Sequence, residues 1–325
     1  MLTRAQFLRL AALGLGTAAL GGCASVSPRE LDAAPRRILV PAAVGGGYDT
    51  TARTAAAVMA AEGITPTQLE VFAVPGGGGL VGLTRALGER GRGSVAMLMG
   101  LGVVGAGVAA GRSDDVLSLT PIARLAEEPG VLLADATTGF DSVHSALATW
   151  RAAPRTVRVG IGSSRGGPDH LFALQVRQAV GIRRDDAVFA EFSGGGELLS
   201  ALLTGRIDLA FGGAGETGSQ IAAGAVRALA VSSAERLAAI DAPTLREAGV
   251  DLVFRNWRGL AAPPGIPDAD RQRWADDVAR MHATAAWRAA LAENGWIDAY
   301  LPGEEFADLI RSQRGLVADV LREDT

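Results

Sequence analysis

The sequence predicts an α/β fold of two lobes with a ligand cleft between them. From Arg37 onward, short apolar runs of strand type alternate with helical stretches, which is typical of helices layered on both faces of a sheet. Two extended apolar segments, residues 123–134 and 228–233, have the character of crossings between lobes. A chain that passes twice between two α/β lobes leaves a cleft where the lobes meet.

The expected elements follow from the spacing of apolar residues along the chain. Strands are expected at residues 37–41, 69–74, 94–99, 131–134, 156–161, 187–191, 206–211, 226–231 and 258–262. Helices are expected at residues 50–62, 80–90, 142–151, 168–180, 195–204, 217–223, 268–282, 285–294 and 304–322. The last of these repeats apolar residues along one face, which is the pattern of an amphipathic helix that packs on a lobe.

Glycine-rich turns follow three of the expected strands and precede expected helices. They occupy residues 44–50, 75–81 and 160–167. Glycine lets the backbone approach a ligand closely, and the first N–H groups of a helix have no partner inside that helix. Because these groups and the helix dipole favour a carboxylate or phosphate, the three turns predict a ligand with more than one anionic group.

Length, composition and charge narrow the functional class. The chain has 325 residues and 48% hydrophobic residues, enough for two lobes with a sizeable core. Its formal net charge is −4, and −6 without residues 1–22, which carry two arginines and no acid. This acidity argues against nucleic-acid binding, which needs a basic patch. The histidines, His144, His170 and His282, are scattered, so neither a metal site nor a cofactor is expected.

Residues 1–22 have the form of a signal peptide. Arg4 and Arg9 flank the start of an apolar stretch that ends at Leu20, which is too short for a bilayer span of ~20 residues. The segment Leu20-Gly21-Gly22-Cys23 resembles a bacterial lipoprotein box, in which the cysteine is lipidated and becomes the first mature residue. Cys23 is the only cysteine, so no disulfide can form within the chain. Residues 23–35 are then expected to be a tether.

Two of the glycine turns also fit catalytic or nucleotide-binding patterns. Residues 77–82 match G-x-G-x-x-G, but the acid that a dinucleotide site needs after the next strand is missing. Residues 162–166 match G-x-S-x-G, the nucleophile elbow of serine hydrolases, with Ser164 as the nucleophile and His282 later in the chain. Such short patterns arise often by chance, and anion binding at helix starts is the favoured interpretation.

Three polar residues beside the turns have alternative interpretations. His170 falls near the start of the helix after the third turn, where it could donate to an anion or pack locally. Asp49 could select an ammonium or hydroxyl group of a ligand, or it could be an N-cap. Glu216 lies just before the expected helix 217–223, after another glycine-containing turn.

Eight short segments of the chain carry motifs that are modest one by one, but their order and spacing together are specific for one family. These segments are residues 45–53, 75–82, 162–171, 194–198, 205–208, 226–231, 242–249 and 257–263. Together they resemble the substrate-binding proteins of tripartite tricarboxylate transporters, the TctC/Bug-like extracytoplasmic solute receptors. The resemblance covers nearly the whole mature chain.

The resemblance implies a periplasmic-binding-protein-like fold of type II. One lobe would comprise residues 36–125 plus 232–325 and the other residues 126–231. The chain would capture a carboxylated metabolite and would not be an enzyme. Citrate and other tricarboxylates are the leading candidates for the ligand. Its partners would be a large and a small integral membrane subunit of the transporter. The receptor itself would be a monomer, held outside the cytoplasm by the lipid at Cys23. A sensor that presents its ligand to a membrane receptor kinase is the alternative.

The resemblance also implies the residues of the site. Two first-lobe loops would bind one carboxylate through backbone N–H groups and ordered water, with the residues Gly46, Gly47, Tyr48, Asp49, Gly78, Gly79 and Leu80. The second lobe would contribute Ser163, His170 and the turn of Ser193, Gly194 and Gly195. At the position of Tyr48, family members that lack the tyrosine usually have a small residue, so Tyr48 either narrows the site or offers its hydroxyl to the ligand. Glu216 is a further candidate, and Arg258 could pair with a distal carboxylate bidentately.

Overall fold

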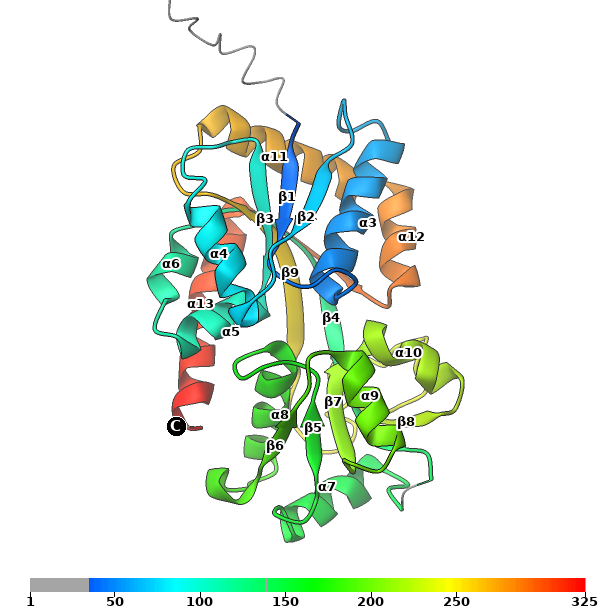
Figure 1. Cartoon of the computed structure of the whole chain (residues 1–325). Coiled ribbons are helices and arrows are strands. Elements are labelled where there is room, and N and C mark those ends of the chain that lie inside the picture. The colour runs from blue at the N-terminus through cyan, green and yellow to red at the C-terminus, as the bar shows by residue number, and fades with distance from the viewer. Residues whose placement is uncertain (1–34, 138, 325) are drawn as a thin grey trace, which may run out of the picture. The chain divides into compact units, whose positions relative to one another are not determined.

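A computed structural model describes residues 35–137 and 139–324, and Figure 1 labels its helices and strands. The predicted signal peptide, Cys23 and the predicted tether lie outside these residues, except for Pro35. The strands are β1 (Arg37–Val40), β2 (Glu70–Ala73), β3 (Val95–Gly100), β4 (Thr120–Asp135), β5 (Val159–Ile161), β6 (Phe189–Glu191), β7 (Leu209–Gly213), β8 (Val226–Val231), β9 (Arg255–Ala262) and β10 (Ile297–Pro302). The helices are α3 (Gly47–Ala61), α4 (Leu80–Leu87), α5 (Leu101–Ala109), α6 (Ser113–Leu117), α7 (Val143–Ala152), α8 (Pro168–Ala179), α9 (Gly195–Leu203), α10 (Ala214–Ala222), α11 (Asp268–His282), α12 (Ala285–Glu293) and α13 (Gly303–Arg322).

Strand β4 connects two lobes of the described chain (Figure 1). Its N-terminal half pairs antiparallel with β9 and β10, and its C-terminal half pairs with β7 and β8. We call the part built on β2, β1, β3, β9 and the start of β4 the first lobe. The part built on the end of β4 with β8, β7, β5 and β6 is the second lobe. The predicted two-lobed α/β fold is therefore confirmed.

The second connection between the lobes is the start of β9. Residues 232–254 hydrogen-bond with the second lobe before β9 begins: the amide of Leu245 donates to the carbonyl of Val231 over 3.0 Å. The buried hydroxyl of Ser232 accepts from the amide of Gly130 at 2.7 Å and donates to the carbonyl of Phe254 at 2.8 Å. It therefore ties the middle of β4 to the residue that precedes β9. A division of the chain at residue 232 stays a prediction.

The nine expected strands are present, but two helices and one strand were not expected. Helix α5 reads Leu-Gly-Val-Val-Gly-Ala-Gly-Val-Ala, and its three glycines disfavour a helix by roughly 1 kcal/mol each. All but the end of it is buried, so packing in the core decides its conformation. The short helix α6 and strand β10 were also missed, and β4 begins eleven residues before the strand expected at 131–134.

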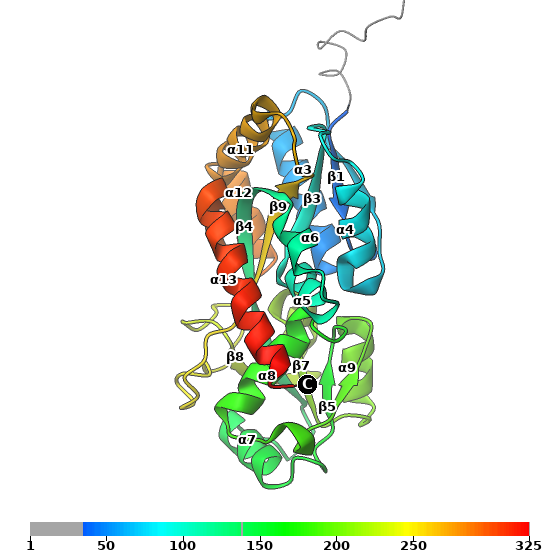
Figure 2. The ribbon, with the colours of Figure 1, turned by 90° about the vertical axis from the view of Figure 1, so that its left-hand side faces the viewer.

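Helix α13 packs on both lobes, whereas the sequence predicted packing on one (Figure 2). It begins beside the first half of β4 and runs past α5 to the second-lobe helix α8. Its buried face carries Phe306, Ile310 and Val317. Just beyond its end, the Asp324 carboxylate accepts from the guanidinium of Arg177, which is 2% exposed, at 2.8 Å. The amphipathic helix predicted at residues 304–322 is therefore present, but it packs on both lobes.

The apolar core continues across the connection between the lobes. Phe172 of α8 stacks on Phe254 with 5.0 Å between the ring centroids, and it meets Phe211 of β7 edge-to-face at 5.1 Å. Trp257 of β9 meets Phe306 of α13 edge-to-face at 5.4 Å. These aromatic contacts hold the crossing strands in place under the site. Across the described residues, no helix is long and apolar enough to cross a bilayer.

Candidate functional site

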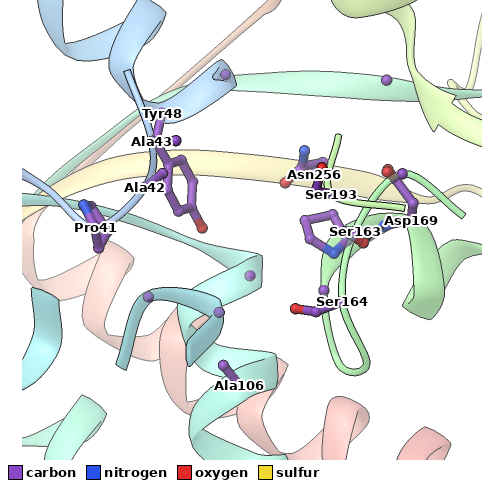
Figure 3. Close-up of a pocket in the computed structure, with 18 of the residues that line it drawn as sticks. Pro41, Ala42, Ala43, Tyr48, Ala106, Ser163, Ser164, Asp169, Ser193 and Asn256 are labelled. Carbon is purple, nitrogen blue, oxygen red and sulfur yellow. Dashed lines mark hydrogen bonds between the residues drawn. The ribbon is translucent and has the colours of Figure 1, made fainter. Parts of the chain in front are cut away.

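A cavity of about 310 Å³ lies between the two lobes (Figure 3). Its first-lobe wall comes from residues 41–43, the start of α3, the turn at residues 75–79 and the start of α5. Its second-lobe wall comes from residues 162–164 and 167–169, Ser193, Gly213 and Glu216. Three side chains of the crossing strands complete it: Glu128, Asn256 and Arg258. A cavity of this size suits a small metabolite.

The first-lobe wall carries backbone N–H groups. Helix α3 begins after Gly46 with no side-chain cap, so the first N–H groups of the helix have no side-chain partner. Gly47 and Tyr48 of this first turn line the cavity. The turn before α4 needs glycine, because residues 76–79 all have positive φ, between 57° and 129°. It brings the backbone of Gly78 and Gly79 to the cavity. The predicted anion-binding turns of the first lobe therefore both reach the cavity.

Tyr48 projects its ring into the cavity from α3 (Figure 3). Its hydroxyl oxygen accepts from the amide of Val103, 3.4 Å away, at the uncapped start of α5. The phenol thus occupies the start of a helix that could otherwise hold an anion, and its own proton stays available to a ligand. Desolvation raises the pKa of Tyr48 to about 12, against the smaller opposite effects of Arg258 and the α5 amides. The side chain therefore both narrows the site and presents a neutral donor.

This raised pKa predicts a loss of stability in alkali. Folding favours the neutral phenol of Tyr48. Its contribution to the free energy of unfolding is therefore complete below pH 10, and about 2 kcal/mol is lost as the pH rises from 10 to about 12. The chain has no lysine and two tyrosines, so few other side chains titrate in this window. Urea unfolding from pH 9.5 to 11.5 should show a steeper decline for the wild type than for Tyr48→Phe. Equal slopes would contradict the prediction.

The register of β4 and β9 places three polar residues on one face of the sheet. Glu128 lies opposite Asn256, and Arg258 lies two residues further along β9. Because alternate residues of a strand share a face, the three side chains point the same way, toward the cavity. Glu128 and Arg258 are 2% and 4% exposed. The crossing strands thus form a polar floor within an otherwise apolar core.

Arg258 is held by protein groups. Its Nη2 donates to Glu128 in an ion pair, and its Nη1 donates to the carbonyl of Gly47 at 3.1 Å and to the hydroxyl of Thr51 at 3.0 Å. A Cβ added at Gly47 would overlap Arg258 Nη2, so a larger residue there would displace the guanidinium. Arg258 therefore joins the crossing strands to the start of α3, and much of its charge is compensated before a ligand arrives.

The second-lobe wall carries acidic side chains. Asp169 is in the first turn of α8 and Glu216 is in the first turn of α10, and both line the cavity. Desolvation and the nearby carboxylates of Glu216 and Glu128 raise the pKa of Asp169 well above its usual value. Desolvation and Glu128 likewise raise the pKa of Glu216. Arg258 acts in the opposite direction on both, but it does not cancel the effect.

The structure brings eight of the predicted site residues to the cavity: Gly47, Tyr48, Gly78, Gly79, Ser163, Ser193, Glu216 and Arg258. The other predicted ligand-binding residues are not among its lining residues: Gly46, Asp49, Leu80, His170, Gly194 and Gly195. The binding role of each residue stays a prediction.

Two of the residues outside the cavity wall have other contacts. The buried Asp49 accepts from the amide of Gly45 at 2.9 Å and from Arg53 at 2.8 Å, and so stabilises the first loop. Desolvation opposes ionisation of Asp49, but these hydrogen bonds lower its pKa. His170 accepts from the amide of Gly166 through Nδ1, and its Nε2 lies 3.9 Å from Asp324. Desolvation lowers the pKa of this imidazole.

The hydrolase pattern at Ser164 is not supported by a nearby base. Among the hydrogen bonds of residues 35–324, none joins Ser164 Oγ to a histidine. His282 pairs with Asp298 at 3.0 Å and stacks on Tyr300. Sequence reasoning missed Glu128 and Asp169 as cavity residues, whereas the segment 256–258 was expected to be able to reach the cleft, and Asn256 does line it. The signal that could have found Glu128 is an acid within an apolar crossing segment, where burial demands a partner.

Comparisons with known proteins agree with this architecture. The family model described as "Tripartite tricarboxylate transporter family receptor" (TctC) matches residues 113–320. Protein BugT of Bordetella pertussis is 26% identical over 264 residues, which cover 79% of this chain and 78% of that protein. A UPF0065 protein from the TAR-I ttuE-ttuC' intergenic region of Agrobacterium vitis is 27% identical over 245 residues, covering 74% and 68%.

Solved structures show the same fold. MatC (Rpa3494) from Rhodopseudomonas palustris with bound malate has a TM-score of 0.75 and 27% identity, and the match covers 88% of this chain and 98% of that one. The R. palustris protein Rpa4515 with adipate has a TM-score of 0.80 and 20% identity, covering 89% and 97%. The family match extends over more than half of the sequence, and the fold and the interlobe cavity agree with it. The chain therefore belongs to the tripartite tricarboxylate transporter receptor family.

Proposed function

We propose that this protein is an extracytoplasmic receptor that captures a small carboxylate between its lobes. The observation that carries the proposal is the uncapped start of α3, whose residues Gly47 and Tyr48 face a cavity of about 310 Å³. Backbone N–H groups at a helix start bind a carboxylate without needing a basic side chain. The malate bound to the related MatC supports the same ligand class.

The mechanism is binding coupled to lobe closure, with no covalent step. A ligand that touches both walls favours the closed form by its difference in affinity for the two forms. The closed form would then present its surface to the integral large and small subunits of a transporter, with lipidated Cys23 holding the receptor at the membrane. Citrate is one candidate among the carboxylates.

The test is a thermal-shift and calorimetry screen of the chain from Ala24 onward. The panel contains malate, succinate, citrate, aspartate, 4-aminobutanoate and the neutral diamide of succinate, with nucleotides as a further control. A carboxylate at 100-fold over its Kd should stabilise the protein by about 2.7 kcal/mol, which raises Tm by several degrees. The diamide should have no effect. Equal shifts with succinate and its diamide, or none with any acid, would refute carboxylate capture.

Replacing Ala43 with tryptophan should abolish binding while leaving the fold intact. Ala43 lines the cavity, yet its side chain is exposed, so a large ring there can occupy the cavity without entering the core. Calorimetry should show at least a hundredfold loss of affinity. The matched control is Ala57→Trp, an exposed alanine of α3 that does not line the cavity. Full affinity in Ala43→Trp would place the ligand elsewhere.

A further inference from the structure

The charged groups of the cavity are unevenly distributed. Its described lining residues carry three carboxylates, Glu128, Asp169 and Glu216, and one guanidinium, Arg258. Glu128 already pairs with Arg258. Asp169 and Glu216 are therefore left without a cationic partner of their own on this wall. Both belong to the second lobe, and none of the first-lobe residues in the lining is acidic.

The helix starts of the second lobe are occupied by the protein's own carboxylates. Glu128 accepts from the amide of Gly215 in α10 at 3.0 Å. The Glu216 carboxylate lies close to Gly195 at the start of α9, and the Asp169 carboxylate lies close to Gly162 in the turn after β5. An added Cβ at Gly195 would lie 2.6 Å from Glu216 Oε2, which shows how closely the two groups approach. A ligand carboxylate on this side would have to displace an internal one.

The first lobe offers the opposite chemistry. The start of α3 has no side-chain cap and faces the cavity through Gly47 and Tyr48. The one acid of its first turn, Asp49, accepts hydrogen bonds from the amide of Gly45 and from Arg53. The first-lobe wall is thus suited to an anion and the second-lobe wall to a cation.

An unsatisfied acceptor on the cavity floor points to a donor on the ligand. Asn256 is 9% exposed and lines the cavity, and its Oδ1 has no hydrogen-bond partner among the described residues. In Figure 3 it is seen between Tyr48 of the first-lobe wall and Asp169 of the second-lobe wall. A buried polar atom without a partner costs free energy, which a ligand N–H group would recover.

We propose that the ligand is an aminocarboxylate, whose carboxylate binds the first-lobe turns and whose ammonium binds Asp169 and Glu216. This inference rests on the proposed function and narrows its ligand class. An ammonium presents three donors, which match two carboxylates and the amide oxygen of Asn256. A dicarboxylate would instead bring its second negative charge against two carboxylates that lack a cation.

The test compares carboxylates with and without an ammonium group, which replaces the hydroxyl of malate in aspartate and, as an aminomethyl group, one carboxylate of succinate in 4-aminobutanoate. Succinate is paired with 4-aminobutanoate and malate with aspartate, and calorimetry is carried out on the chain from Ala24 onward. We expect at least a tenfold preference for one or both amino members. The double variant Asp169→Asn/Glu216→Gln should lose that preference. The matched control is Glu304→Gln, since Glu304 is an exposed acid in the first turn of α13 that does not line the cavity.

The outcomes separate this inference from the proposed function. Tighter binding of succinate and malate than of their amino counterparts would overturn the inference and leave carboxylate capture standing. An amino preference that persists in the double variant would also overturn it, because the ammonium would then bind elsewhere. Absence of binding by all four compounds and by citrate would refute both proposals.

Discussion

Arg258→Gln should lower the free energy of unfolding by about 3–5 kcal/mol, which is typical when one partner of a buried ion pair is removed. The substitution leaves Glu128, 2% exposed, without its cation, and it removes the donors to Gly47 and Thr51. Urea unfolding at neutral pH measures the change. The loss should be this large because three acids then surround a floor that has no positive charge.

Two further variants make the test of Arg258 specific. Arg311→Gln removes an exposed partner of Asp308 on α13 and should have little effect, since such pairs contribute about 0–1 kcal/mol. The double variant Glu128→Gln/Arg258→Gln should recover part of the lost stability, because the two residues are coupled. A change below about 1 kcal/mol in Arg258→Gln would show that the pair does not stabilise the floor.

Gly105→Ala should reduce ligand affinity roughly tenfold to hundredfold without weakening the lobes. Gly105 lies in α5 of the first lobe, and a Cβ there would overlap the carbonyl oxygen of Gly166 in the second lobe. Overpacking of this kind costs about 1–3 kcal/mol, and it would act on the form in which the lobes touch. Alanine also favours the helix by up to about 1 kcal/mol. Calorimetry with the ligand from the screen measures the effect.

The control for Gly105→Ala is the same substitution at another glycine within a helix. A Cβ at Gly218 of α10 would meet no atom within 4 Å, so Gly218→Ala should bind as the wild type does. Small-angle scattering of Gly105→Ala with saturating ligand should give a larger radius of gyration than the liganded wild type. Unchanged affinity and radius would mean that the loop around Gly166 moves aside at little cost.

The fold was largely predictable from the sequence, because strands and amphipathic helices carry a local pattern. Helix α5 is the clearest of the elements that were missed, because its glycines permit close contact with the second lobe and remove the local helix signal. A local pattern reports propensity, and tertiary packing overrode it here. The strand expected at residues 131–134 was too short, because the first part of β4 includes proline and charged residues, although the extended crossing expected at residues 123–134 does lie within β4.

The candidate site was partly predictable on both lobes. The first-lobe turns are marked by consecutive glycines, and both reach the cavity, as do the predicted residues Ser163, Ser193 and Glu216 of the second lobe. Arg258 was also expected at the site, but its pairing with Glu128 was not predictable, because the two residues meet through strand register across 130 positions of the chain. His170, whose binding role stays a prediction, is not among the lining residues. Asp169 faces the cavity, and the next residue of a helix is rotated by about 100°, which turns His170 toward Asp324.

The position of Asp324 has a practical consequence for how the protein is handled. Helix α13 is followed by Asp324, whose carboxylate binds the buried Arg177 of the second lobe. A purification tag or fluorescent protein fused behind this position would therefore place its load on the segment whose carboxylate pairs with that buried guanidinium. Labels intended to report lobe movement are better attached through the exposed Ala57 on α3 and the exposed Leu203 at the end of α9.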